Sequence, residues 1–179
     1  MPLCATCWST KAERSRRNTL CYVTSSDPLP IQRFSHLCVG VSDMDTSLAF
    51  YTGLLGMDVV FDIQLDGAGL DAVTGTSDAA GRMVGGLIGG TMVELLDLGY
   101  VPAVPDGPHR GYTNMSFTVA DVDAVYQHVV GRSDVKCVPP VDIGGVRMMF
   151  VYDPDGTPIE FIELPGGAET TEQLWRPAG

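Results

Sequence analysis

Two stretches of the chain repeat the same alternation of polar and apolar positions. Residues 36–41 read HLCVGV and residues 114–119 read NMSFTV, so small or polar side chains alternate with aliphatic or aromatic ones. A period of two predicts a strand with one buried face. The other face then carries His36 in the first stretch and Asn114 in the second. The chain therefore starts the same kind of strand twice.

Both strands are followed by the pattern of a helix. Asp43 or Asp45 precedes a run with apolar residues at helical spacing, and Asp121 precedes another. Acidic residues at these places are typical N-caps. Gly53 and Gly131 come where the two helices are expected to end. When the stretches are aligned, each acid and each glycine falls over its counterpart, which indicates an internal duplication.

Three further strand-like runs complete each unit. They cover residues 57–65, 83–88 and 91–98 in the first unit and residues 135–141, 146–153 and 158–164 in the second, with a turn at DPDG, residues 153–156. The sequence thus predicts an α+β fold of two tandem βαβββ modules that form a cupped mixed sheet around a central cavity. Residues 66–86 are rich in glycine and mostly lack a counterpart in the second unit, so we expect a lid or a substrate-facing loop there.

The patterns divide the chain into five segments. We expect a disordered arm at residues 1–32, a first module at 33–100, a linker at 101–111, a second module at 112–165 and a C-terminal tail at 166–179. Residues 33–165 together make one domain. The arm lacks apolar periodicity and the apolar core of a secretory signal.

The last strands of the two units place a glutamate at the centre of an apolar run. The sequences are GTMVELLDL at residues 90–98 and GTPIEFIEL at residues 156–164. One glutamate in such a strand is usually a solvated edge residue. Two at matched positions, Glu94 and Glu160, each joined by a polar residue on the first strand of its unit, indicate that His36 and Asn114 share a site with them.

Composition limits the partners. The chain has 179 residues, 45% of them hydrophobic and 18% charged, and a net charge of −11. Such a charge argues against nucleic acid and anionic membranes as partners, and no apolar run is long enough to cross a bilayer. The five cysteines show no disulfide or zinc-finger spacing, so we expect free thiols in the cytoplasm.

Four motifs resemble the vicinal oxygen chelate superfamily, which includes glyoxalase I, methylmalonyl-CoA epimerase, fosfomycin-resistance proteins and extradiol dioxygenases. They are SHLCVGVSDMDTSLAFYTGLLGM, TMVELLDL, YTNMSFTVADVDAVYQHV and VYDPDGTPIEFIEL, which together span residues 35–164. The resemblance implies a divalent metal held by the first and last strands of both modules. By position, its ligands are His36, Glu94, Asn114 and Glu160. Asn114 departs from the histidine common in the glyoxalase and epimerase branches.

The chemistry of these four residues narrows the choice of metal only partly. One imidazole and two carboxylates suit Zn²⁺, Ni²⁺, Co²⁺, Mn²⁺ or Fe²⁺. If Asn114 ligates through its carbonyl oxygen, Mn²⁺ or Mg²⁺ is favoured. Asn114 otherwise leaves a position open for substrate, hydrogen-bonds a metal-bound water, or marks a site that no longer binds metal.

The resemblance implies proton abstraction next to a carbonyl. Glu160 is the expected base, and Glu94 is the expected partner that returns the proton. The sequence hypothesis is therefore a metal-dependent isomerase, epimerase or carbon–sulfur lyase for a small carbonyl compound. Extradiol dioxygenase and fosfomycin-type thiol transferase activities are disfavoured by Asn114. The non-enzymatic alternative is a metal-free protein that sequesters ligands in an aromatic cleft, for which the candidates are Phe61, Tyr100, Phe150 and Tyr152.

Four further residues are candidates for substrate contacts, each with a structural alternative. His109 lies in the linker and is either a surface residue or a substitute ligand or acid–base group. Arg82 and Arg147 are candidate anion contacts or members of salt bridges, and Tyr152 lies on the expected cavity face. We also expect a homodimer, because pairing of chains completes the cavity in some members of the superfamily.

Overall fold

The computed structural model describes residues 31–99, 102–103 and 110–175. The described residues from Ser35 onward belong to one compact unit. The expected arm at residues 1–32 lies almost entirely outside the described residues, as do most of the linker and the candidate His109. No helix in the described part of the chain is long and apolar enough to cross a membrane.

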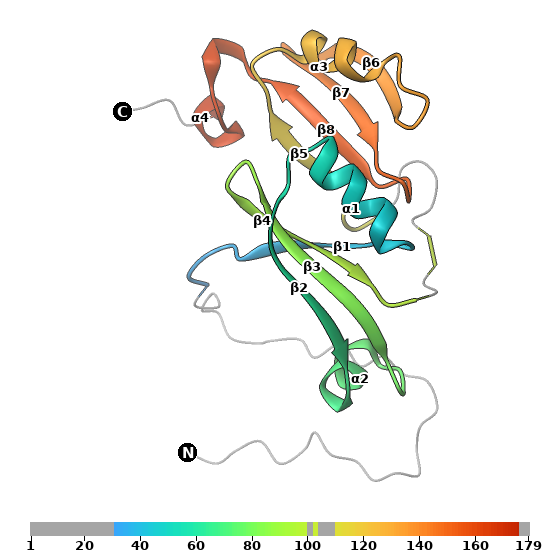
Figure 1. Cartoon of the computed structure of the whole chain (residues 1–179). Coiled ribbons are helices and arrows are strands. Elements are labelled where there is room, and N and C mark those ends of the chain that lie inside the picture. Colours follow the sequence, from blue (N-terminus) through green and yellow to red (C-terminus); the bar gives the residue numbers. More distant parts are fainter. Residues whose placement is uncertain (1–30, 100–101, 104–109, 176–179) are drawn as a thin grey trace, which may run out of the picture. The chain divides into compact units, whose positions relative to one another are not determined.

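The compact unit contains the order βαβββ twice, with an additional helix, α2, between the second and third strands of the first module (Figure 1). The first module consists of β1 (His36–Gly40), α1 (Met44–Gly53), β2 (Asp58–Asp66), α2 (Ala68–Thr74), β3 (Ala80–Ile88) and β4 (Thr91–Asp97). The second consists of β5 (Met115–Thr118), α3 (Val122–Val129), β6 (Lys136–Ile143), β7 (Val146–Tyr152) and β8 (Pro158–Glu163), followed by a 3-10 helix (Pro165–Gly167) and α4 (Thr171–Trp175).

Each module folds into its own four-stranded mixed sheet. The strand orders are β1-β4-β3-β2 and β5-β8-β7-β6, with the first pair parallel and the others antiparallel. The predicted α+β fold of tandem βαβββ modules is confirmed. Because the two orders are identical, equivalent residues of the two modules occupy equivalent places on their sheets.

The expected loop at residues 66–86 is wrong for most of its length. This segment contains α2 and the larger part of β3. Its glycines are needed for close packing in the sheet. A Cβ at Gly85 would lie 2.3 Å from the Phe61 ring, and one at Gly86 would lie 2.6 Å from Cγ of Met57. Gly85 and Gly86, which lie in the strand predicted at residues 83–88, therefore make room for neighbouring side chains.

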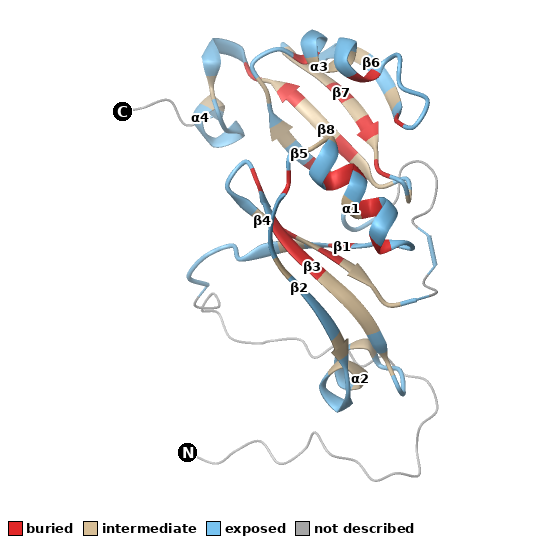
Figure 2. Cartoon of the chain, viewed as in Figure 1, coloured by how far each residue is buried: buried red, intermediate tan, exposed pale blue. Residues whose placement is uncertain are grey.

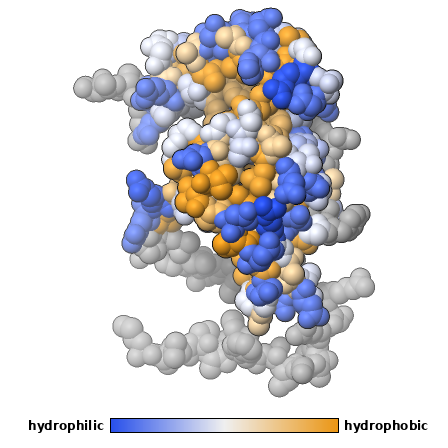
Figure 3. Space-filling view, viewed as in Figure 1, coloured by the Kyte–Doolittle hydropathy of each residue, from blue (hydrophilic) through white to orange (hydrophobic). Residues whose placement is uncertain are grey.

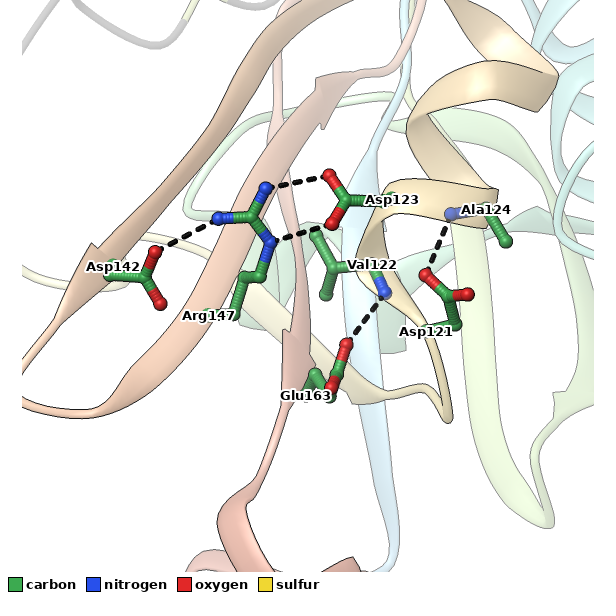
Figure 4. A network of polar contacts seen from close by, with 7 residues as sticks. All are labelled: Asp121, Val122, Asp123, Ala124, Asp142, Arg147 and Glu163. Carbon is green, nitrogen blue, oxygen red and sulfur yellow. Dashed lines mark hydrogen bonds and ion pairs between the residues drawn. The ribbon is translucent and has the colours of Figure 1, made fainter.

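The two main helices begin at the expected aspartates. Asp43 accepts a hydrogen bond from Thr46 N at 2.7 Å, so Asp43 rather than Asp45 is the N-cap of α1. Asp121 accepts one from Ala124 N at 2.9 Å in α3 (Figure 4). These bonds satisfy backbone donors that the first turn of a helix leaves unpaired.

A single apolar core runs through both modules. Its fully buried members include Tyr51 of α1, Leu95 of β4, Val151 of β7 and Ile159 of β8. Figure 2 shows the buried residues in red on these elements. Helix α3 packs on β6, β7 and β8, and α1 contacts β4. One face of each sheet is thereby used for the core.

A buried hydrogen-bond network joins α1 to the turn between β7 and β8. Tyr51 Oη donates to Asp153 at 2.9 Å, and Asp153 also accepts from the backbone N–H groups of Asp155 and Thr157 at 3.0 and 2.7 Å. Ser42 N donates to the Asp155 carboxylate at 3.0 Å. Burial raises the pKa of Asp153, although hydrogen bonds from Thr157 and Tyr51 lower it. This DPDG network connects the two modules.

Candidate functional site

The four candidate ligands occupy equivalent positions in the two sheets. Glu94 of β4 pairs with Cys38 of β1, two residues after His36. Glu160 of β8 pairs with Ser116 of β5, two residues after Asn114. Since side chains on alternate residues share a face, each glutamate lies on the same side of its sheet as its partner. The internal duplication thus reaches the level of individual side chains.

His36 and Glu94 lie next to each other on the first sheet. His36 Nε2 is 3.4 Å from Glu94 Oε2, with 43% of the histidine side chain and 14% of the glutamate side chain exposed. Ser35 Oγ lies 3.1 Å from His36 Nδ1. If Nδ1 carries the proton and donates to Ser35, Nε2 presents a lone pair beside the carboxylate. A cation stabilises that arrangement, and the second contact of the ring fixes its orientation.

Asn114 and Glu160 form the corresponding contact on the second sheet. Asn114 Nδ2 donates to Glu160 Oε2 at 3.3 Å, and Asn114 Oδ1 accepts from Thr113 Oγ1 at 2.9 Å. Both Asn114 and Glu160 are half-buried. With its amide oxygen engaged by Thr113, Asn114 holds the carboxylate of Glu160 in place. This contact fits a role in orienting Glu160.

The two pairs are not gathered into one ligand set within the chain. The described residues contain no cluster of three or more histidine, cysteine, aspartate or glutamate side chains close enough to hold one metal ion. The pairs belong to separate sheets that share no strand. Each module of a single chain therefore carries one of the two pairs.

Around Glu94 the face carries a glycine, an aromatic ring and a thiol in the same row of the sheet. Gly85 of β3 pairs with Glu94, and the Phe61 ring lies over this glycine, as the short distances to its missing Cβ show. Cys38 lies beside Glu94 on β1. Burial, and then the negative charge of Glu94, raise the pKa of the Cys38 thiol. Cys38 therefore stays protonated near neutral pH, and its place on the face of His36 follows from the alternation at residues 36–41.

The face around Glu160 carries aromatic rings and a cation. Phe150 of β7 pairs with Glu160 on one side and with Val138 of β6 on the other. Tyr152 lies on the same face, one alternation along β7, and Lys136 of β6 pairs with it. Lys136 Nζ is 4.5 Å from the centroid of the Tyr152 ring. Tyr152 is one of the candidates predicted from the sequence, whereas Lys136 is not.

Both arginine candidates form salt bridges on the other face of their sheets. Arg147 binds Asp123 of α3 through two hydrogen bonds of 2.9 and 2.6 Å and Asp142 of β6 at 2.9 Å (Figure 4). Arg82 binds its equivalent partners, Asp62 of β2 and Asp45 of α1.

Hydrogen bonds from these arginines lower the pKa of Asp62 and Asp123. In both modules an arginine on the sheet thus forms ion pairs with the first turn of the helix and with a neighbouring strand. Of the two roles predicted for Arg82 and Arg147, the structure shows the salt bridge.

Two pockets lie near these elements, and neither contains any of the four candidate ligands. One, of about 270 Å³, lies along β1 and is lined by Cys38, Tyr112, Asp155 and Pro158 among others. The other, of about 370 Å³, is apolar and lies on the core side between α1 and α3, with Leu54, His128 and Phe161 in its wall. The first pocket adjoins the faces that carry the glutamates, because Cys38 neighbours Glu94 and Pro158 is two residues before Glu160.

The fold and the matched pairs agree with the comparison to known families. The family model of the Glyoxalase/Bleomycin resistance protein/Dioxygenase superfamily matches residues 33–161, and the chain belongs to this superfamily. The resemblance to vicinal oxygen chelate proteins is confirmed.

Two relatives extend over most of the chain. A 2-epi-5-epi-valiolone epimerase from an Actinomyces species is 26% identical over 161 residues, which cover 80% of this chain and 88% of the epimerase. The uncharacterized protein YaeR of Escherichia coli (strain K12) is 28% identical over 140 residues, which cover 75% of this chain and 98% of YaeR.

Solved structures share the fold at low identity. A glyoxalase family protein from Bacillus cereus superposes with a TM-score of 0.61 at 18% identity, covering 79% of this chain and 98% of that protein. The fosfomycin resistance protein FosX from Listeria monocytogenes, in complex with Mn(II) and sulfate, has a TM-score of 0.54 at 16% identity, covering 82% and 99%.

Proposed function

We propose that this protein is a divalent-metal-dependent isomerase or epimerase, or a related lyase, that removes a proton next to the carbonyl group of a small substrate. The observation that carries this proposal is the matched geometry of the His36–Glu94 and Asn114–Glu160 pairs. Duplicated structure alone does not require a carboxylate at the centre of both last strands. The similarity to an epimerase supports the same class of reaction.

The donor set fits a divalent cation. An imidazole nitrogen and a carboxylate oxygen 3.4 Å apart on the first sheet offer two ligand atoms to one ion. Glu160 adds a second carboxylate, held by the Asn114 amide. Nitrogen and oxygen donors in this ratio suit Mn²⁺, Fe²⁺, Co²⁺, Ni²⁺ or Zn²⁺ better than Mg²⁺, because Mg²⁺ takes oxygen ligands.

A second copy of the chain supplies the missing half of the site in this proposal. Two chains related by a twofold axis bring the His36–Glu94 pair of one copy opposite the Asn114–Glu160 pair of the other. The antiparallel strands β2 and β3 offer apolar surface for such pairing, with Val59, Val60, Ile63 and Leu87 exposed. Figure 3 shows apolar side chains over these two strands on the face in view. We expect a cytoplasmic homodimer with two sites.

The residues of the chain have different roles in this mechanism. A bound divalent ion would polarise the substrate carbonyl and stabilise negative charge on its oxygen. Glu160 takes the proton from the adjacent carbon, with Asn114 holding the carboxylate in position. Glu94 approaches from the opposite module and returns a proton to the other side of that carbon. Phe61 and Phe150 limit access of water to the two carboxylates.

Exchange of the α-proton with solvent tests this function. Metal-loaded protein in deuterated water is expected to incorporate deuterium next to the carbonyl in at least one member of a panel of α-hydroxyketones and 2-substituted 3-oxo acids. Protein stripped with a chelator is expected to lose this activity and to regain it on addition of Mn²⁺, Co²⁺, Ni²⁺ or Zn²⁺. Exchange that is unchanged by stripping would contradict the role of the metal.

The second candidate function is metal-free binding of a small apolar ligand. Two observations favour it: the separation of the two pairs in one chain, and the Phe61 ring over Gly85 on the face that carries Glu94. This alternative predicts saturable binding of an aromatic compound that needs no metal and survives replacement of His36. The metal-dependent exchange above separates the two functions.

A further inference from the structure

Lys136 is an exposed cation outside the apolar core. The chain contains two lysines, Lys11 and Lys136, and carries a net charge of −11. Within the described ranges, Arg82, Arg132 and Arg147 form ion pairs with aspartates, whereas Lys136, like the exposed Arg33 and Arg110, forms none. Its ammonium group instead lies over the Tyr152 ring at 4.5 Å. In so acidic a chain, a cation without a carboxylate partner is available to an anionic ligand.

The register of the second sheet places Lys136 on the same face as Glu160. Lys136, Tyr152 and Pro158 form one row across β6, β7 and β8, and Val138, Phe150 and Glu160 form the row of the same orientation two residues further along. With strand spacings of about 4.8 Å, the Cα atoms of Lys136 and Glu160 are roughly 12 Å apart. A lysine stem of about 6 Å leaves room between the two charges for a few carbon atoms.

We infer that Lys136, held over Tyr152, binds an anionic group of the substrate while Glu160 acts on the carbon next to the carbonyl. This inference rests on the proposed function, because it takes the face around Glu160 as the substrate site. The substrate class is then a short carbonyl compound with a carboxylate or a phosphate a few bonds from the reacting carbon. The contact with the ring reduces the conformational freedom that Lys136 loses on binding.

Selective NMR of the two lysines tests this contact. The chain is produced with ¹³C at the lysine ε-carbon, which gives two signals, and Lys136→Arg identifies the one from Lys136. The probes are levulinate with its methyl ester, and dihydroxyacetone phosphate with dihydroxyacetone, at constant ionic strength. We expect a saturable shift of the Lys136 signal at roughly millimolar carboxylate or phosphate and none with the neutral partner. The Lys11 signal is the internal control.

Calorimetry on variants supplies the second readout. Lys136→Gln is expected to bind the anionic probes at least about tenfold more weakly, while Lys136→Arg keeps most of the affinity. Equal affinities of wild type and Lys136→Gln, no binding of any anionic probe, or parallel unsaturable shifts of both lysines would overturn the inference. A Lys136-dependent shift in a protein without metal-dependent exchange would instead support anion binding and count against the proposed chemistry. Failure of the Lys136 inference and failure of the proposed function therefore give different experimental results.

Discussion

Glu160→Gln is expected to reduce metal-dependent α-proton exchange by about 10²- to 10⁴-fold, the usual contribution of a positioned general base. The amide keeps the size of the side chain and its place beside Asn114, but it cannot accept the proton. Because the amide is also a weaker metal ligand, the variant is compared with wild type at saturating metal, which isolates the loss of the base. Exchange rates measured by NMR in deuterated water, at saturating metal, give the ratio directly. Asn114→Ala is expected to have a smaller effect, because the carboxylate remains but loses the donor that holds it at 3.3 Å.

Glu163→Gln is the matched control for this experiment. It makes the same chemical change on the same strand, three residues away and on the opposite face, where Glu163 accepts a hydrogen bond from Val122 N at 3.1 Å (Figure 4). It is expected to leave exchange unchanged. Glu94→Gln separates the two carboxylates, since it is expected to permit removal of a proton by Glu160 but to block inversion. Full exchange in Glu160→Gln would refute the assignment of the base.

Asp153→Ala is expected to lower the free energy of unfolding by about 3 to 5 kcal/mol, the largest effect on stability that we predict. The change leaves the buried Tyr51 hydroxyl and two backbone N–H groups without their acceptor. Tyr51→Phe removes one bond of this network and is expected to cost about 1 to 2 kcal/mol. Urea unfolding followed by circular dichroism measures both. Because the two residues are in direct contact, the double variant is expected to show less than the sum.

Two control variants distinguish loss of the DPDG network from the effect of changing any buried polar side chain and from the effect of removing any surface charge. Ser47 of α1 is fully buried, and its hydroxyl has no hydrogen-bond partner in the structure as far as it is described. Ser47→Ala is therefore expected to leave stability unchanged or raise it slightly. Asp134 is exposed and paired with Arg132, so Asp134→Ala is expected to cost less than about 1 kcal/mol. A loss in Asp153→Ala no larger than that in Asp134→Ala would contradict the importance of the DPDG network.

The stability conferred by Asp153 is also expected to depend on pH. Because the pKa of Asp153 is raised, the folded protein binds this proton more tightly than the unfolded chain. The contribution is fully present below the ordinary carboxyl pKa of about 4 and is lost as pH rises through the raised value. The difference in free energy of unfolding between wild type and Asp153→Ala is thus expected to be larger near pH ~4 than at neutral pH.

Much of the fold was predictable because local signals agreed with the duplication. The alternation at residues 36–41, the aspartate caps and the repeated glutamate strands each appear twice, so each copy supported the reading of the other. The small residues before residue 83 misled the prediction, since they form α2 and the start of β3 rather than a loop, whereas the strand predicted at residues 83–88 is present. What Gly85 of that strand contacts is decided by Phe61, on a strand distant in sequence.

The candidate site was predictable as pairs but not as a whole. Period two puts each of the four residues on the face of its strand away from the core aliphatics. The matched positions in the two units then predict the pairs, which the register of β1 with β4 and of β5 with β8 brings together. Neither the separation of the pairs nor the position of Lys136 follows from a local pattern. Lys136 reaches the face of Glu160 only through the pairing of β6 with β7 and of β7 with β8.

Metal content is the most direct test of the claim that the two pairs form one site. Wild-type protein, His36→Ala, Glu160→Gln and the control Glu163→Gln are loaded with Mn²⁺, Co²⁺, Ni²⁺, Zn²⁺ or Fe²⁺, dialysed and measured by elemental analysis. We predict about one ion per chain in wild type and in Glu163→Gln, and loss of the ion in both His36→Ala and Glu160→Gln. No retained metal in wild type, or full retention in Glu160→Gln when His36→Ala loses it, would contradict a shared site.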